Sequence, residues 1–310
     1  MEFYYEPIML NEILEGLNIN PSGIYVDGTL GGAGHSEQIL KRLNSNGLLI
    51  GIDKDEEAIS YSSERLKEYK NKLLVKSDFK DVKKVLEENN IQGLDGVLID
   101  LGISSHQIDS AERGFSFLRD GKLDMRMDKR QSFSAYDVVN FYSEEKLLKI
   151  LYEYGEESFA KPIVRKIIEE RKKKPIETTL ELKNIIESAL PKKYIFKSGG
   201  ASKKTFQAIR IEVNGELDRL EDTIRYLITM LKSGGRMAVL SFHSLEDRIV
   251  KRVFKEENEN CVCPPNIPIC ICGHKKSVNL INKKPITASE EEQKRNPRST
   301  SAKLRIIEKI

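Results

Sequence analysis

Short apolar runs alternate with amphipathic stretches over the first hundred residues of this chain. Four runs have the length and the β-branched content of buried strands, at residues 24–26, 48–52, 73–75 and 96–100. The stretches that follow the first three runs carry apolar positions at helical spacing, at residues 36–43, 56–67 and 82–88. Strands and helices that alternate in this way predict a doubly wound α/β fold with a parallel sheet.

The alternation stops after Asp100 and resumes much later. Residues 143–155, 160–172 and 178–190 each read as a helix, and Thr178 with Glu181 forms a capping-box pattern. A long helix over residues 205–231, a strand over 235–243 and a helix over 245–255 follow, and residues 283–287 and 302–309 suit a late strand pair at the sheet edge. We therefore expect one sheet domain, at residues 1–108 and 205–310, interrupted by an all-helical domain at 109–204.

A cluster of small residues follows the first predicted strand. It contains Gly28, Gly31, Gly32, Ala33 and Gly34, and such a loop lets the backbone approach a ligand closely. The next strand ends in Asp53, which stands 22 residues beyond Gly31 (53 − 31), near the spacing of a ribose-binding acid in dinucleotide folds. The unit predicts a bound nucleoside, and its spacing alone leaves a dinucleotide, an adenosyl cofactor and a purely structural turn open.

Polar residues stand at the carboxyl ends of all the predicted parallel strands, and these ends meet at one edge of a doubly wound sheet. Phe79 follows the third strand, where its ring either stacks on a purine or belongs to the core. His243 is either a general base or a neighbour that caps a helix. The strand-end residues are Asp27, Asp53, residues 77–79, Asp100 and residues 241–243.

Composition narrows the class of protein. Hydrophobic residues make up 39% and charged residues 32%, which is typical of a globular chain, and no apolar run reaches membrane-spanning length. The N-terminus has no secretory signal pattern, so we expect a cytoplasmic protein with no membrane partner. The sequence also has neither a P-loop motif nor a Gly-x-Ser-x-Gly elbow, which argues against phosphoryl transfer and the common hydrolase chemistry.

The positive charge is concentrated in one segment. Residues 161–204 hold 13 Lys or Arg and 5 Glu, a local charge of +8, and the whole chain carries +3, so the remainder carries −5. This distribution suits a segment that meets a polyanion, with a solvated lysine-rich surface as the alternative.

All four cysteines lie in one short stretch. They form two Cys-x-Cys pairs, Cys261 with Cys263 and Cys270 with Cys272. Four thiols at this spacing suit a structural zinc ion, and a cytoplasmic location disfavours disulfides. The spacing differs from the usual Cys-x-x-Cys, and we expect no catalytic role for this site.

Six ordered blocks of the sequence together resemble one known family. The blocks are Asp27-Gly-Thr-Leu-Gly-Gly-Ala-Gly-His-Ser36, Asp100-Leu-Gly-Ile-Ser-Ser105, Glu112-Arg-Gly-Phe-Ser-Phe117, Leu123-Asp-Met-Arg-Met-Asp128, Thr205-Phe-Gln-Ala-Ile-Arg-Ile211 and Ser241-Phe-His-Ser-Leu-Glu-Asp-Arg248. They are similar to those of the MraW family, the ribosomal RNA small subunit methyltransferase H enzymes. The likeness spans nearly the whole chain, from Tyr5 to about Ile307.

The resemblance implies a class I S-adenosylmethionine-dependent methyltransferase, with a Rossmann-like sheet and a helical insert. It implies methyl transfer from S-adenosylmethionine to the exocyclic N4 of a cytidine in the decoding region of 16S rRNA, in the small ribosomal subunit. The cofactor contacts that it implies fall on Ala33, Gly34, His35, Asp53, Phe79, Asp100 and Gln107.

The chemistry of the N4 atom calls for groups that hold the base and accept a proton. Asp100 is the first candidate for this catalytic role. Many amino methyltransferases carry two prolines directly after this acid, and Leu101 and Gly102 stand there in this chain, so some of the groups that hold the base must come from elsewhere. Ser241, His243 and Asp124 are further candidates. The basic insert, above all residues 171–174 and 192–204, is expected to bind the RNA backbone.

Two other functions start from the same features. A nicotinamide-dependent oxidoreductase would share the glycine loop and bind NAD, and an RNA-binding assembly factor would retain RNA affinity without methyl transfer. The sequence allows both a monomer and a homodimer.

Overall fold

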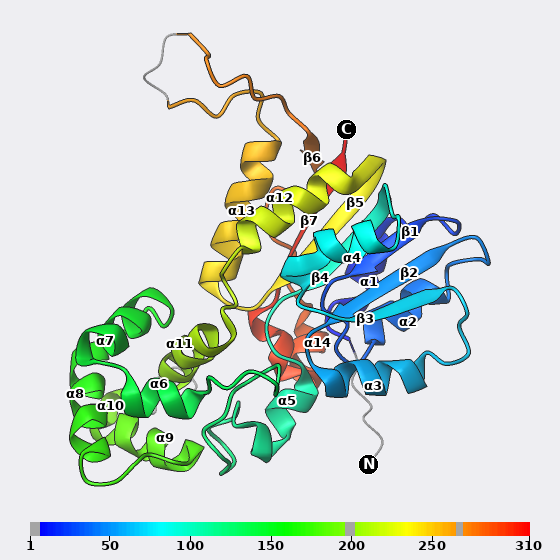
Figure 1. Ribbon diagram of the computed structural model, residues 1–310. Coiled ribbons are helices and arrows are strands. Elements are labelled where there is room, and N and C mark those ends of the chain that lie inside the picture. The colour runs from blue at the N-terminus through cyan, green and yellow to red at the C-terminus, as the bar shows by residue number, and fades with distance from the viewer. Residues whose placement is uncertain (1–6, 196–201, 265–268) are drawn as a thin grey trace. The chain divides into compact units, whose positions relative to one another are not determined.

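The computed structural model describes residues 7–195, 202–264 and 269–310 (Figure 1). The chain divides into two compact units. The first unit joins the N-terminal part of the chain, up to Gly102, to the C-terminal part from Leu217 onward, and the second unit is Ile103–Glu216. Residues 196–201 of the predicted basic stretch, and the first residues of the region that resembles the MraW family, lie outside the described residues.

A seven-stranded sheet forms the centre of the first unit, with the strand order β3-β2-β1-β4-β5-β7-β6. Strands β3 through β5 in this order pair in parallel, while β7 is antiparallel to both β5 and β6. The strands are β1 (Ile24–Asp27), β2 (Leu48–Asp53), β3 (Lys72–Lys76), β4 (Leu94–Asp100), β5 (Leu231–Ser241), β6 (Val278–Leu280) and β7 (Lys303–Lys309). The order reverses between β1 and β4, which is where an open α/β sheet forms its ligand crevice.

Helices cover both faces of this sheet, as Figure 1 shows. One face packs on α4 (Val82–Glu88), α12 (Leu220–Met230) and α13 (Ser244–Glu257), and the other on α1 (Leu10–Leu17), α2 (Gly34–Leu40) and α3 (Glu56–Arg65). Alternate residues of each strand serve the two cores, because successive side chains of a strand point to opposite faces. In β4, Val97 and Ile99 lie in the first core and Leu98 in the second.

The C-terminal part of the first unit also contains α14 (Glu290–Arg295) and the 3-10 helix η3 (Pro297–Ser301). A short 3-10 helix, η1 (Phe79–Asp81), follows β3 in the N-terminal part. This arrangement confirms the predicted doubly wound α/β fold. No helix among the described residues is both long and apolar enough to cross a membrane.

The second unit is built from helices around its own core. The largest contributions come from α6, α7, α8 and α11, whose buried apolar residues belong to a single cluster. Its elements are α5 (Ser105–Asp109), η2 (Ala111–Arg113), α6 (Ala135–Phe141), α7 (Glu144–Glu153), α8 (Ala160–Arg171), α9 (Thr179–Ser188), α10 (Lys192–Ile195) and α11 (Lys203–Asn214). The predicted capping box is present at α9, where the Thr178 hydroxyl accepts from the N–H of Glu181 at 3.2 Å. Helix α11 belongs to this unit, whereas the sequence analysis assigned its residues to the sheet domain.

Two elements differ from the sequence prediction. The long helix expected over residues 205–231 is two helices, because Gly215 takes a left-handed conformation (φ +54°) that ends α11. The partner of β7 at the sheet edge is β6, and residues 283–287 contribute only the single bridge Ile286–Leu304. Pro285 has no N–H to donate, which is consistent with so short a pairing.

Candidate functional site

The glycine loop connects β1 to α2 and is hydrogen-bonded to both neighbouring strands. The N–H of Gly28 donates to the carbonyl oxygen of Leu98 in β4 at 2.9 Å, and the N–H of Leu30 donates to that of Ile52 in β2, also at 2.9 Å. Gly31 (φ +49°) and Ala33 (φ +57°) take left-handed conformations. For Ala33 this costs about 1–2 kcal/mol, and such strain concentrates at functional sites.

A buried pair of side chains fixes the base of the loop. Asp27 closes β1 with 2% exposure, and the hydroxyl of Ser36 in α2 donates to its Oδ2 at 2.6 Å. The N–H of Thr29 donates to Oδ1 at 3.2 Å. Burial raises the pKa of Asp27 to about 6, against the opposing effect of these two hydrogen bonds. Both of its oxygens therefore have partners within the loop, so Asp27 supports the loop structurally.

Asp53 closes β2 and faces the loop. Its Oδ2 accepts the N–H of Gly31 at 2.8 Å and its Oδ1 accepts the N–H of Asp55 at 2.8 Å. A carboxylate oxygen can accept two hydrogen bonds, so each oxygen keeps capacity for one more donor. Burial raises the pKa of Asp53 to about 6, opposed by the two N–H groups.

Asp100 and His35 face each other across the switch point of the sheet. Asp100 closes β4, where its N–H donates to the Thr29 hydroxyl at 2.6 Å, and its Oδ2 lies 3.8 Å from Nδ1 of His35. Burial, with the charges of Asp27 and Glu246, raises the pKa of Asp100 to about 8, whereas burial lowers the pKa of His35 to about 4. Both groups are neutral at pH 7, so the contact is not an ion pair there, although their separation would allow one.

The His35 ring is held from its other side. Its Nε2 lies 2.9 Å from the carbonyl oxygen of Ile8, which can only accept, so Nε2 carries the proton. Nδ1, which faces Asp100, is then the unprotonated nitrogen. Among the described residues, the buried Oδ1 of Asp100 has no hydrogen-bond partner. A buried oxygen of this kind is costly unless a ligand supplies the missing donor.

Phe79 begins η1, just after β3. Its ring is partly buried and packs against the sheet core that includes α4 and α12. The Cβ atom of Phe79 lies 3.4 Å from the point where a side chain on Gly28 would begin. Phe79 therefore lies beside the glycine loop and contributes to the core as well.

Two candidates from the sequence lie in the second unit. The side chain of Gln107 is buried in the capping box of α5, where its Oε1 accepts the N–H of Ser104 at 3.1 Å. Asp124 accepts from the guanidinium of Arg126 at 2.9 and 2.7 Å. Each has a partner within its own unit.

Ser241 and His243 have structural roles in the first unit. The Ser241 hydroxyl donates to the carbonyl oxygen of Lys303 in β7 at 3.4 Å. His243 is the N-cap of α13, because its Nδ1 accepts the N–H of Glu246 at 3.4 Å. Oε2 of Glu246 in turn accepts the N–H groups of Phe242 and His243, at 2.9 and 3.2 Å. Of the two roles considered for His243, the structure supports helix capping.

The basic residues at 171–174, which were predicted to bind the RNA backbone, are only partly free to bind an anion. The Arg171 guanidinium donates to the backbone carbonyls of Val139 and Tyr142, both at 2.7 Å, and so joins α8 to α6. Lys173 pairs with Glu170 at 2.9 Å, and Lys174 pairs with Glu181. Arg171 is therefore an internal structural residue of the second unit.

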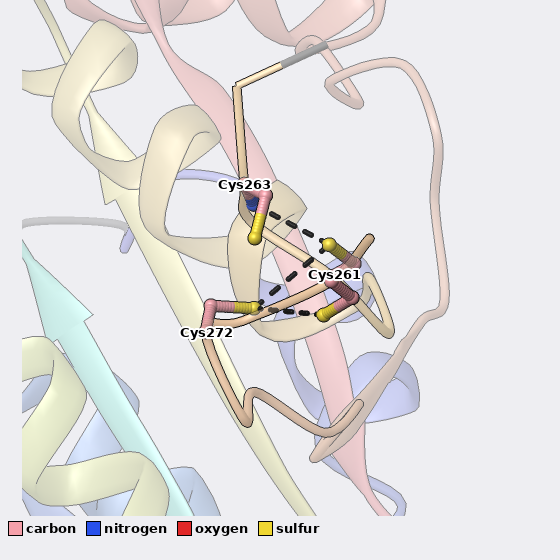
Figure 2. A group of neighbouring side chains, drawn as sticks. Cys261, Cys263 and Cys272 are labelled. Atoms are coloured by element: carbon pink, nitrogen blue, oxygen red, sulfur yellow. Dashed lines mark hydrogen bonds between the residues drawn. The ribbon is translucent and has the colours of Figure 1, made fainter. Parts of the chain in front are cut away.

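The four cysteines lie together in the connection between α13 and β6, and all are free thiols. Their sulfur atoms fall within 4.8 Å of one another. Figure 2 shows the side chains of Cys261, Cys263 and Cys272 in this loop.

Sequence reasoning missed three groups that shape the crevice. Thr29 positions the backbone of Asp100, the Ile8 carbonyl sets the tautomer of His35, and Glu246 raises the pKa of Asp100. Glu246 carried a signal, since a glutamate three residues after a cap is a capping-box pattern. The contribution of Ile8 is a backbone atom, for which a sequence has no signal.

The strained glycine loop lies beside Asp53, and a second half-buried acid, Asp100, closes β4 at the switch point. This arrangement is typical of an α/β protein that binds a nucleoside-containing cofactor. The model of the MraW methylase family matches residues 2–310, and the chain belongs to that family.

Its relatives align with it over their whole length. The chain is 52% identical over 311 residues to "Ribosomal RNA small subunit methyltransferase H" of Clostridioides difficile (strain 630), and the alignment covers 100% of both chains. It is 50% identical over 311 residues to the protein of the same name from Lachnospira eligens (strain ATCC 27750 / DSM 3376 / VPI C15-48 / C15-B4), covering 100% of this chain and 99% of the relative. These findings confirm the resemblance that the six sequence blocks indicate, and the class I methyltransferase fold with it.

Solved structures resemble the chain more distantly. A putative rRNA-methylase from Clostridium thermocellum is 11% identical with a TM-score of 0.47, covering 99% of this chain and 100% of that one. SMU.1697c, a putative methyltransferase from Streptococcus mutans in complex with SAH, is 12% identical with a TM-score of 0.42, covering 99% and 100%.

Proposed function

We propose that this chain transfers a methyl group from S-adenosylmethionine to the exocyclic N4 of a specific cytidine in the decoding region of 16S rRNA. The observation that carries the proposal is that the Gly31 N–H donates to Asp53 while Oδ1 of Asp100, at the switch point, has no hydrogen-bond partner among the described residues, in a chain of the MraW methylase family. The names of relatives that share 50–52% of its residues support small-subunit rRNA as the substrate. Such a substrate would be met in the cytoplasm.

The crevice residues fit the cofactor. Asp53 retains two acceptor sites for the ribose hydroxyls, and Phe79, a half-buried aromatic residue beside the loop, would contact the adenine. The unpartnered oxygen of Asp100 would accept from a cationic group near the methionine end. The proposed contacts are Ala33, Gly34, His35, Asp53, Phe79, Asp100 and Gln107, of which Gln107 belongs to the second unit.

Bound S-adenosylmethionine supplies an activated sulfonium methyl group. The N4 lone pair forms the new C–N bond as the C–S bond breaks toward sulfur, and N4 gives up one proton. Because the N4 lone pair is conjugated with the ring, acceptors on its hydrogens favour the reactive geometry. We assign this to Asp100, with backbone carbonyls as its partners; once ionised, Asp100 can accept the proton. The zinc ion that the cysteines predict would have no step in this chemistry.

The second unit would bind the RNA backbone through exposed cations on α8 and at its C-cap. Lys161, Arg165 and Lys172 are exposed and, within the described part of the chain, no ion pair is found for them. Their spacing of four and seven residues places them on one face of the helix. We propose these three cations as the RNA contact in place of Arg171, whose guanidinium is hydrogen-bonded to backbone carbonyls of the same unit.

The RNA contact has a direct test in the salt dependence of binding. Replacing Lys161, Arg165 and Lys172 together by alanine should lower the slope of log Kd against log salt by about 2, since each phosphate contact on a single strand contributes about 0.7. The matched control is the triple alanine variant of Lys166, Lys173 and Lys174, whose ammonium groups pair with acids of the same unit. Equal slopes for the two variants would show that Lys161, Arg165 and Lys172 do not contact RNA.

Methylation of small-subunit RNA by the purified protein, read by mass spectrometry as N4-methylcytidine, tests the whole proposal. Thermal shifts with S-adenosylhomocysteine and with NAD distinguish it from an oxidoreductase, because only the former should stabilise the protein. RNA binding without methyl transfer would instead indicate an assembly factor. Sedimentation at the assay concentration distinguishes a monomer from a homodimer.

A further inference from the structure

The connection between α13 and β6 brings all four cysteines of the chain to one point. The two Cys-x-Cys pairs come from opposite sides of this connection, and their sulfur atoms lie within 4.8 Å of one another. Sγ of Cys272 is 3.5 Å from that of Cys270 and 3.8 Å from that of Cys261 (Figure 2). From this geometry we propose that the four thiolates bind one structural zinc ion.

The separations match the chemistry of a closed zinc site. Zinc bound to four thiolates is tetrahedral with Zn–S bonds of about 2.3 Å, which places neighbouring sulfurs about 3.8 Å apart. The two sulfur separations of 3.5 and 3.8 Å in the loop lie slightly below this value and at it. Four ligands leave no open coordination position, and this is the arrangement of structural rather than catalytic zinc.

Apolar burial does not explain why these thiols converge. The apolar residues interleaved with the cysteines face solvent, with exposures of 42% for Val262, 76% for Ile269 and 78% for Ile271. A loop without its own core needs another source of free energy to order its chain. Metal–thiolate bonds supply that free energy in small closed sites.

The ends of the loop are already tied together. The Ser277 N–H donates to the Glu257 carbonyl oxygen at 2.8 Å, and the Ser277 hydroxyl donates to the Glu257 carboxylate at 2.6 Å. The connection over residues 258–276 is longer than about 15 residues, a length that is uncommon between consecutive elements of a compact domain. A metal bound by both cysteine pairs would divide this connection into shorter segments, which lowers the entropy that closing the whole connection would cost.

Neighbouring groups support thiolate ligands. The N–H of Cys263 donates to Sγ of Cys261 at 3.4 Å, a contact that stabilises negative charge on sulfur. Lys275 and Lys276 follow the last cysteine and offset the charge of a four-thiolate site. His274, the nearest alternative ligand in the sequence, has its Nε2 2.9 Å from the carbonyl oxygen of Glu256. The ligand set is therefore the four cysteines.

The experiment measures metal in the full-length protein, purified under reducing conditions without chelator. Elemental analysis should give about one zinc per chain, and the metal-free protein should bind Co²⁺ with the absorption of a tetrahedral four-thiolate site. Cys261→Ser and Cys270→Ser each remove one ligand and should lose the stoichiometric zinc. Ile271→Ala is the matched control, because this exposed residue lies between two ligands and its variant should keep the metal.

A second readout does not depend on metal analysis. Removing the metal with a chelator should raise protease cleavage within the loop by about tenfold or more in the wild type, and should change nothing in Cys270→Ser. Uptake of S-adenosylhomocysteine by the same samples shows that the variants remain folded, and it is independent of the zinc site.

Three outcomes would overturn the zinc assignment. They are metal-free protein that takes up no zinc, stoichiometric iron in its place, or disulfides between the cysteines that persist through purification under reducing conditions. None of these outcomes bears on methyl transfer.

Discussion

The protonation of Asp100 should make binding of the methyl donor depend on pH. Burial and the charges of Asp27 and Glu246 raise the pKa of this carboxyl to about 8, so at pH 7 about nine-tenths of the free protein carries it neutral. The proposed ligand is cationic at sulfur and at its amino group, and it interacts best with ionised Asp100. Binding at pH 7 should therefore release about one proton.

The direction and the size of this pH dependence of donor binding follow from the pKa of Asp100. Below pH 8, part of the free energy of donor binding is used to deprotonate Asp100, so the affinity for the donor should rise with pH and level off above about 8. Between pH 7 and pH 9 the ionised fraction rises from about 0.1 to about 0.9, which predicts about a tenfold tighter Kd, or about 1.4 kcal/mol. The pKa values of Asp27 and Asp53 are about 6 and that of His35 about 4, so these three groups contribute little in this window.

Calorimetry in two buffers of different ionisation enthalpy measures both the affinity and the proton release. Asp100→Asn cannot ionise, so its affinity should be flat between pH 7 and 9 and its proton release near zero. S-adenosylhomocysteine lacks the sulfonium charge and should show a smaller pH dependence than the donor. If Asp100→Asn retained the full dependence of the wild type, another group would be responsible and the reasoning about Asp100 would be wrong.

Two further substitutions separate binding from structural roles. His243→Ala should lower the free energy of unfolding by about 1 kcal/mol, because α13 loses its cap. His243→Asn keeps a capping acceptor and should retain both stability and methyl transfer. A large loss of activity in His243→Asn at unchanged stability would instead indicate a catalytic role. Asp53→Asn should weaken cofactor binding by about tenfold to a hundredfold, since a charged acceptor for two hydroxyls contributes about 1.5–3 kcal/mol. Calorimetry measures the affinity of this variant beside that of the control Asp81→Asn, which changes an acid outside the proposed site. Equal affinities of the two variants would show that Asp53 does not contact the cofactor.

The sheet and its strand-end acids were predictable because one physical pattern encodes both. A strand buried on both faces is a short apolar run, and it ends where the chain reaches the polar edge of the sheet. Residues 48–52 followed by Asp53 show this directly, and the structure extends that strand only to Asp53 itself. The glycine loop was visible for a similar reason, since few residues other than glycine accept the conformation of Gly31.

The partners of charged side chains could not be read in the same way. Arg171 looks like any other cation in a basic stretch, yet the groups that it binds are carbonyls of Val139 and Tyr142, some thirty residues away. Backbone acceptors carry no signature in the sequence, so net charge overestimated what this segment offers to RNA. The break at Gly215 was missed for a different reason, since the helical periodicity on both sides is strong enough to mask one glycine.

Charge in the crevice suggests why donor and product would bind differently. Asp27, Asp53, Asp100 and Glu246 all lie around the carboxyl ends of β1, β2, β4 and β5, and the ring nitrogen that faces Asp100 belongs to His35, whose pKa burial lowers to about 4. Acids gathered in this way repel one another, which is part of why the pKa of Asp100 is raised, and a cationic ligand relieves that repulsion. In the proposed reaction, transfer of the methyl group would leave the sulfur neutral, and the acids would lose part of their compensating charge. Asp100 would then take up a proton more readily, either from solvent or from N4, and the weaker attraction would favour release of the product.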